Sequence, residues 1–140
     1  MKLSYEDDYA LKTVLDLALC YGKNAHIKDI AKRQDIPAKF LEQLLLKLKK
    51  AGIVKSKKGP NGGYMLSKPP EKITVKEILE VLNGPFAPIE CAWNKNYKTK
   101  CTFFSNCVFR IIFEDIYITV NEKLEKLNFK KLCELQKTIK

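Results

Sequence analysis

Three cysteines, Cys91, Cys101 and Cys107, lie close together in a polar stretch of the chain. Thiolates spaced along an irregular segment can bind a soft metal ion or an iron–sulfur cluster, and they can also act as redox-sensitive thiols. Zinc is disfavoured, because its structural sites usually contain a close pair of cysteines two residues apart, which this stretch lacks. The spacing therefore predicts a metal, cluster or thiol redox site, with any fourth ligand supplied from elsewhere.

The N-terminus indicates the compartment in which these thiols would work. Residues 1–8 include four charged side chains and offer no apolar core of a signal peptide. No run approaches the roughly 18 apolar residues of a membrane helix. We therefore expect a cytoplasmic protein with no membrane partner, in a compartment where thiols stay reduced. Two further cysteines, Cys20 and Cys133, are expected to be packing residues.

The net charge of +10 is concentrated in one segment. Residues 28–58 contain ten Lys or Arg and three acidic residues, a net of +7. Such a cluster is typical of a surface that binds a polyanion such as DNA. The alternative from charge alone is a lysine-rich face that is simply solvated.

The first three elements are predicted to form a helix-turn-helix. Residues 5–21 show apolar side chains at helical spacing, and residues 26–34 form a shorter second helix. Pro37 then forces a turn, because proline restricts the residue before it and suits the first turn of a helix. The inward face expected of the first helix is Leu11, Val14, Leu15, Ala18 and Leu19.

A third helix is predicted from about residue 38 to residue 51, with Gly52 well placed to end it. Its exposed face carries Lys39, Glu42 and Gln43. In a helix that enters the major groove, lysine can donate to guanine, glutamine can pair with adenine, and glutamate can accept from cytosine. These three residues are the candidate base contacts. The opposite, inward face is Leu41, Leu44, Leu45 and Leu48.

Residues 53–67 are predicted to form a β-hairpin, because two short strands flank a turn rich in glycine at 59–63. A hairpin directly after a DNA-recognition helix is a wing. Lys55, Lys57 and Lys58 lie near its tip and can contact phosphates or enter the minor groove. A nucleotide-binding loop is disfavoured, since no Gly-Lys-Ser/Thr follows and no helix begins there.

The C-terminal half is predicted to hold a short amphipathic helix at 73–82, an irregular loop up to Cys107, and a long helix at 104–127. The long helix is apolar over so wide an arc that it needs two partners. One is the chain's own DNA-binding domain, and the other is the same helix of a second subunit. We therefore expect a homodimer that binds a palindromic operator in double-stranded DNA. A long helix buried within a monomer is disfavoured, because too little chain remains to cover it.

The predicted fold class is mainly α with a small β-hairpin. Residues 1–72 form a winged helix-turn-helix DNA-binding domain, residues 73–103 a short helix and the cysteine-bearing loop, and residues 104–140 a dimerisation helix and a C-terminal helix. An enzyme is not expected, because the chain has one histidine, His26, and no nucleophile–base pair or cofactor loop.

Several of these segments together resemble the Rrf2 family of bacterial winged-helix transcriptional regulators. The resemblance covers nearly the whole chain and implies that Lys39, Glu42 and Gln43 contact bases. It also implies that Lys58 reaches the minor groove, although many relatives carry arginine there and lysine lacks its planar fork. The segments are Met1-Lys2-Leu3-Ser4, Leu41-Glu42-Gln43-Leu44-Leu45, Gly52-Ile53-Val54 and Lys58-Gly59-Pro60-Asn61-Gly62-Gly63-Tyr64.

The same resemblance implies an iron–sulfur cluster, 4Fe-4S in preference to 2Fe-2S. Cys91, Cys101 and Cys107 match the cluster ligands of IscR-like and NsrR-like members, although nine residues separate the first two where those members have five. Arg110 stands where IscR-type members have a histidine ligand. Asp8 matches the carboxylate that NsrR-type members supply across the dimer, which implies Asp8 of the partner subunit as the fourth ligand.

The implied function is a dimeric, sequence-specific repressor that senses redox state, nitric oxide or iron–sulfur status. Within the same fold, the alternative is a cluster-free thiol switch. A small metal-binding enzyme is a more distant alternative.

Overall fold

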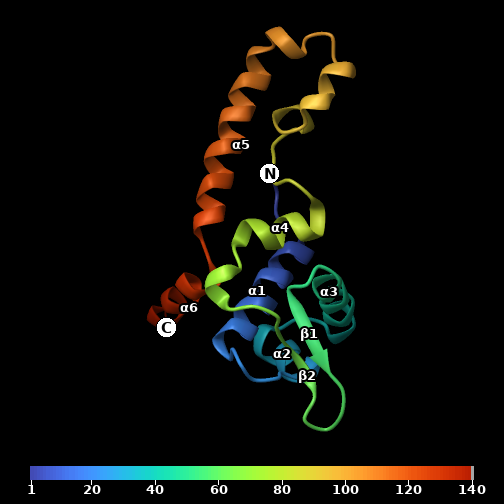
Figure 1. Ribbon diagram of the computed structural model, residues 1–140, viewed down its shortest axis with the longest axis vertical. Coiled ribbons are helices and arrows are strands. Elements are labelled where there is room, and N and C mark those ends of the chain that lie inside the picture. The colour runs from blue at the N-terminus through green and yellow to red at the C-terminus, as the bar shows by residue number, and fades with distance from the viewer. Residues whose placement is uncertain (140) are drawn as a thin grey trace.

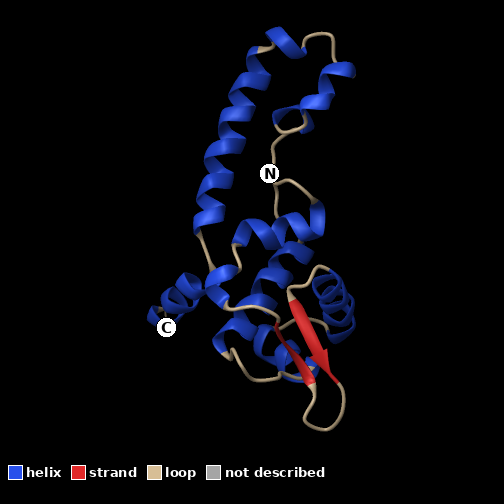
Figure 2. Ribbon diagram, in the orientation of Figure 1, coloured by secondary structure: helices blue, strands red, loops and turns tan. Residues whose placement is uncertain are grey.

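The computed structural model describes residues 1–139 and is mainly helical, as predicted. Figure 2 shows a single antiparallel hairpin among the helices of this part of the chain. The helices are α1 (Tyr5–Leu19), α2 (Ile27–Gln34), α3 (Ala38–Lys50), α4 (Val75–Asn83), α5 (Val108–Lys126) and α6 (Phe129–Thr138). The strands are β1 (Val54–Lys57) and β2 (Gly63–Leu66), and 3-10 turns span Pro70–Lys72, Glu90–Ala92, Lys95–Thr99 and Phe104–Asn106.

The elements form a body and an arm (Figure 1). The body consists of α1 to α4, the hairpin and α6, with α1 in contact with α2, α3, α4 and α6. The arm consists of α5 and residues 88–107, which we call the cysteine loop, and it extends away from the body. The hairpin tip and the far end of the arm lie at opposite ends of the molecule. Within residues 1–139, no helix has both the length and the apolar character to cross a membrane.

The start of α1 is fixed by a capping box and by a bond to α4. Ser4 accepts a hydrogen bond from the backbone of Asp7, and the Asp7 carboxylate accepts from the backbone and hydroxyl of Ser4. The other carboxylate oxygen of Asp7 accepts from Asn83 Nδ2 at 2.8 Å. The first turn of α1 is therefore tied to the end of α4.

The buried face of α1 differs in part from the predicted one. Leu11 and Leu15 are half-buried and border a groove beside α6, whereas Leu19, predicted to face inward, is exposed. Because α1 contacts elements on several sides, its apolar residues are divided between two faces. The residues that enter the core are Ala10, Val14, Leu17 and Ala18.

The core below α3 follows the prediction, since all four inward leucines of that helix are buried. The hairpin is joined to this core through Ala25, which exchanges two backbone hydrogen bonds of 2.8 Å with Tyr64. Gly63 has a φ of 131°, and a Cβ there would lie 2.5 Å from the carbonyl oxygen of Ala25. Only glycine allows this close approach, so Gly63, the third glycine of the turn, lets the hairpin pair with the body.

The predicted helix at 104–127 is interrupted near its start. Cys107 has extended backbone angles and caps α5, so the helix begins at Val108 and a separate turn occupies Phe104–Asn106. Within Val108–Lys126 only Asn121 is buried, and it donates to the Phe86 carbonyl at 2.8 Å. After α5 the chain returns to the body, where Phe129 and Cys133 of α6 enter the core.

Candidate functional site

The exposed face of α3 carries all three predicted base contacts. Lys39, Glu42 and Gln43 are exposed, and they lie opposite the buried leucines of the same helix. Leu46 is also on this outer side and is 52% exposed. A polar and basic face on the second helix of a helix-turn-helix is the arrangement that enters a major groove.

The position of α3 is fixed by contacts to α1 and β1. Phe40 packs edge-to-face on Tyr9 with ring centroids 5.3 Å apart. Lys47 forms an ion pair with Glu6, and Lys49 Nζ donates to the hydroxyl of Ser56 at 2.7 Å. These contacts occupy the ends and flanks of α3 and leave its outer face free.

The three predicted wing lysines, Lys55, Lys57 and Lys58, are exposed. The turn that follows them is tight, because a Cβ on Gly62 would lie 2.1 Å from the carbonyl oxygen of Lys57. The hairpin therefore holds its lysines beside a compact tip at the end of the molecule that is remote from the arm (Figure 1).

The cysteine loop is built from three short turns beside α5. Cys91 lies in the turn Glu90–Ala92, which contacts α5, and Cys107 caps that helix. Cys101 lies between the other two turns. All three are half-buried free thiols. The loop thus places its thiols along one arm of the molecule.

Arg110 holds the end of this loop on α5. Its Nε donates to the Phe104 carbonyl at 2.7 Å, its Nη1 lies 2.6 Å from Glu114, and its guanidinium lies 4.3 Å from the centre of the Phe104 ring. Arg110 is therefore a structural residue of the loop, and its charge and contacts are unlike those of a metal ligand.

Asp8 lies on α1, where Lys12 binds one of its carboxylate oxygens at 2.7 Å. Its side chain is about half exposed and borders an open cavity of about 790 Å³ with Lys2, Leu3, Ser4 and Tyr5. Among residues 1–139, no three His, Cys, Asp or Glu side chains are gathered as a single metal ion would require. Within one chain the structure therefore does not bring the three cysteines together, with or without Asp8.

Comparison with known proteins identifies the family. Residues 3–135 match the family model Rrf2, described as an iron-dependent transcriptional regulator. The chain belongs to the Rrf2 family. It is 31% identical over 133 residues to IscR of Aliivibrio salmonicida, an alignment that covers 94% of this chain and 77% of that protein. The expectation of a transcriptional regulator, and not an enzyme, is confirmed by these Rrf2 relatives.

Two solved structures are also similar to this Rrf2 chain. CymR of B. subtilis, titled the global cysteine regulator, gives a TM-score of 0.75 at 29% identity and covers 96% of this chain and 98% of that one. IscR of T. potens gives a TM-score of 0.75 at 29% identity, with 99% and 88% covered. The winged-helix fold is therefore confirmed, and the similar structures include both an IscR and a CymR.

Sequence reasoning missed the residues that position the DNA-binding helices of this Rrf2 protein. Tyr9 and Phe40 are ordinary aromatic residues in the sequence, and their pairing depends on how α1 crosses α3. Asp16 is a buried acid on α1 that pairs with Arg33 on α2 and raises the pKa of that guanidinium. No local pattern in the sequence indicates this pairing, because Asp16 and Arg33 lie on different helices.

Proposed function

We propose that this Rrf2-family protein is a cytoplasmic, dimeric repressor that binds a palindromic operator in double-stranded DNA. The observation that carries the proposal is the outer face of α3, where Lys39, Glu42 and Gln43 are exposed while the opposite face is buried. Paired with guanine, cytosine and adenine respectively, these side chains could distinguish a base sequence.

The wing supplies the contacts that do not depend on sequence. Lys58 enters the minor groove, and Lys55 and Lys57 contact phosphates, since all three are exposed at the DNA-binding end of the body. Such contacts set the register of the protein on the duplex, whereas α3 selects the bases.

The second subunit binds along α5. Val108, Ile112 and Ile116 follow one another at intervals of one helical turn and are 58%, 47% and 40% exposed. Exposure of an apolar row of this length to water is unfavourable, so the row is suited to contact with another protein surface. Twofold pairing of two α5 helices covers both rows and sets two α3 helices against two half-sites, which is why the operator is expected to be a palindrome.

An experiment on the DNA-binding part is selection from a pool of random duplexes by the full-length protein. An inverted repeat should be enriched, with half-sites separated by about one turn of DNA or a multiple of it. Enrichment of a single, unrepeated site would contradict the dimeric proposal. No enrichment at all would contradict sequence-specific binding.

The cysteine loop holds an iron–sulfur cluster, 4Fe-4S in preference to 2Fe-2S, in this proposal. Cys91, Cys101 and Cys107 are free, half-buried thiols, a donor set that suits such a cluster better than a single metal ion. Asp8 of the partner subunit is the fourth ligand, and the open cavity beside this residue leaves room for an approaching loop. A cluster bound there would supply iron that reacts with oxygen or nitric oxide.

The first turn of α1 is placed to connect that site with DNA binding. Glu6 pairs with Lys47 of α3, Asp7 bonds α4 through Asn83, and Tyr9 packs on α3. A displacement of Asp8 would therefore move residues that hold α3, and operator affinity would change with the state of the site.

The cluster proposal is tested by anaerobic purification followed by iron and sulfide assay and a visible absorption spectrum. We expect a coloured protein in which Ala at any one of Cys91, Cys101 and Cys107 lowers bound iron. Cys133→Ala is the matched control, because Cys133 is buried in the core away from the loop. A colourless protein, or an amount of bound iron that none of the three loop variants lowers, would contradict the cluster proposal.

A cluster-free thiol switch is the second candidate. It is favoured by the separation of the three loop thiols within one chain and by the likeness to CymR, the global cysteine regulator of B. subtilis. In that case the protein as isolated contains no iron. Its affinity for the selected duplex would instead change on oxidation of the loop thiols and return on reduction.

A further inference from the structure

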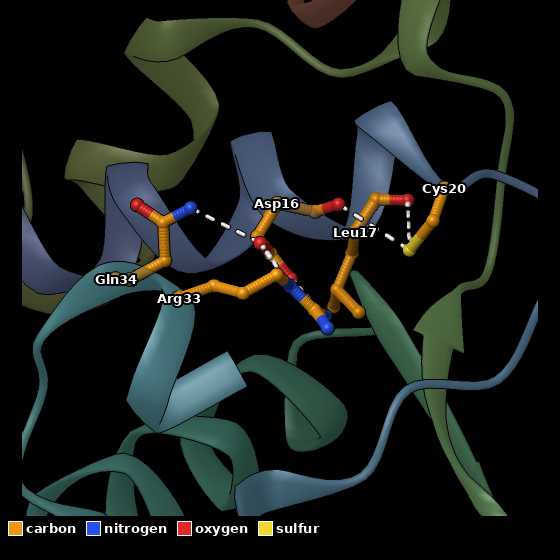
Figure 3. Close-up of polar contacts among 5 residues, drawn as sticks. All are labelled: Asp16, Leu17, Cys20, Arg33 and Gln34. Carbon is orange, nitrogen blue, oxygen red and sulfur yellow. Dashed lines mark hydrogen bonds and ion pairs between the residues drawn. The ribbon is translucent and has the colours of Figure 1, made fainter. Parts of the chain in front are cut away.

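We propose that Asp16, Arg33 and Gln34 form a clamp that positions the DNA-contacting helix α3. The inference rests on the proposed function, since it assigns positioning residues for sequence-specific binding through α3. Figure 3 shows the carboxylate of Asp16 facing both partners from α1. We call these three residues the Asp16 clamp.

The carboxylate of Asp16 is both buried and fully engaged. Arg33 donates to it with two parallel bonds, Nε to Oδ1 at 2.9 Å and Nη2 to Oδ2 at 2.7 Å. Gln34 Nε2 donates to Oδ1 at 3.0 Å. Asp16 is only 5% exposed, so loss of a partner would leave a largely desolvated carboxylate. A bidentate contact of this kind fixes direction as well as distance.

The clamp acts at the point where the chain turns from α2 into α3. Arg33 and Gln34 are the last two residues of α2. Asp35 follows in the left-handed conformation, with a φ of 52°, and α3 begins at Ala38, immediately after Pro37. Three residues thus separate the clamp from α3, and rotation at the end of α2 would be transmitted to α3.

Few other contacts hold α2. It has eight residues, its N-cap His26 makes no side-chain capping bond, and Ile30 is its only fully buried residue. Ile27 and Ala31 also pack against the core but are only partly buried, so the apolar contacts of α2 are limited in area. The Asp16 clamp adds a directional polar contact at the end of the helix, where it restricts rotation of α2.

Cys20 lies on the other side of Asp16 and is not part of the clamp. Its thiol donates to the backbone carbonyls of Asp16 and Leu17, at 3.3 and 3.7 Å, and not to the carboxylate (Figure 3). The side chain of Asp16 therefore serves α2 alone.

The test compares affinity for the duplex selected by the wild-type protein with affinity for a duplex of the same length and scrambled sequence. Asp16→Asn should weaken binding to the selected duplex roughly tenfold, within the range for residues that act through a packed network without touching the ligand. Binding to the scrambled duplex should change little, because the exposed lysines remain. Arg33→Lys should weaken binding to the selected duplex to a similar extent, since lysine cannot form the two parallel bonds to Asp16.

Asp29→Asn is the matched control. Asp29 lies on α2, is exposed, and makes no ion pair within residues 1–139, so this variant makes the same change in charge without removing a hydrogen bond of the clamp. Its affinity for the selected duplex should stay within about twofold of wild type, as expected of a surface substitution. Circular dichroism at the assay temperature checks that every variant is folded.

Three outcomes would overturn the inference. Equal losses on selected and scrambled duplexes would mean that Asp16 only stabilises the fold. Asp16→Asn could instead bind the duplex more strongly, while Arg33→Gln shows an affinity that depends less on salt concentration. That pair of results would mean that Arg33 contacts a phosphate and is restrained by Asp16. Unchanged affinity for the selected duplex would show that the clamp has no role. If the wild-type protein selects no sequence, the proposed function itself fails.

Discussion

The body and the arm of this protein differ in how much of each is completed within one chain. In the body, the leucines of α3, the hairpin and α6 share one core with α1, and the one buried acid on the α2 side of α1 is fully paired. In the arm, α5 buries a single residue, Asn121, and presents a row of apolar side chains to water. The apolar side chains of the body are therefore buried within one chain, whereas those of the arm are not.

This difference indicates which properties belong to the chain alone and which to an assembly. The exposed face of α3 is fixed by the folded body, because the opposite face is buried in the core of the same chain. The cysteine loop and Asp8 do not form a site within one chain. Regulation that couples the two regions would therefore depend on the dimer, whereas the fold of the body would not.

The largest effect is expected from removing core volume in the body. Leu45 is fully buried, so Leu45→Ala should lower the free energy of unfolding by about 2–5 kcal/mol. Leu46→Ala is the control, because Leu46 is adjacent on the same helix but 52% exposed. Urea denaturation monitored by circular dichroism measures both. Equal losses of unfolding free energy in the two variants would mean that Leu45 does not lie on the buried face of α3.

A charge in the apolar row of α5 should affect dimerisation and leave the stability of the body nearly unchanged. Ile112→Glu is expected to convert a dimer to monomers, because a buried, unpaired carboxylate is costly, while the unfolding of the body changes little. Sedimentation velocity measures the change, with Glu122→Ala on the exposed part of the same helix as control. An Ile112→Glu protein that remains dimeric would place the dimer interface elsewhere.

Gln43→Ala should act on base recognition without affecting either region's stability. If Gln43 contacts adenine, the variant should lose about 1–3 kcal/mol of discrimination at one base pair and leave the others unchanged. Affinities for the selected duplex and its single-base variants measure this. Losses spread evenly over all positions would contradict a direct base contact.

The elements of the body could be predicted from sequence because their signals are local. Helical spacing, Pro37 and the glycine turn each act within a few residues, so the order of helices and strands and the buried face of α3 were predicted correctly. The errors fall where no local pattern gives the outcome. Leu19 belongs to the predicted inward face of α1 but is exposed, and α5 starts later than predicted because Cys107 has extended backbone angles.

The candidate site could be predicted only in part for the same reason. Exposure of Lys39, Glu42 and Gln43 follows from which face of α3 is apolar, and the structure agrees. The pairing of Asp16 with Arg33 joins residues 17 positions apart on different helices, and no local pattern indicates it. The ligand role of Asp8 stays a prediction, because it concerns a second chain.

A smaller effect is expected at the wing. Lys57→Ala should reduce the slope of the logarithm of affinity against the logarithm of salt concentration by about 0.9, the contribution of one phosphate contact. Lys98→Ala is the control, since Lys98 is an exposed lysine of the cysteine loop, at the other end of the molecule. If both variants change the slope equally, the DNA contacts extend to the arm and the two regions are less separate in function than in structure.

The smallest effect concerns the thiol chemistry of the two regions in cluster-free, reduced protein. Burial raises the pKa of the Cys133 thiol above its ordinary value, so at a given pH less of it is thiolate. Alkylation of Cys133 should therefore require higher pH in the folded protein than in denaturant, where the thiol regains its ordinary pKa. Mass spectrometry of iodoacetamide adducts across a pH series measures the shift. Cys133 is buried in the body, whereas Cys101 is half-buried in the cysteine loop. Slower labelling of Cys133 than of Cys101 would therefore mean that the body stays closed while the arm is accessible. Equal rates at the two thiols would mean that α6 opens as readily as the cysteine loop moves.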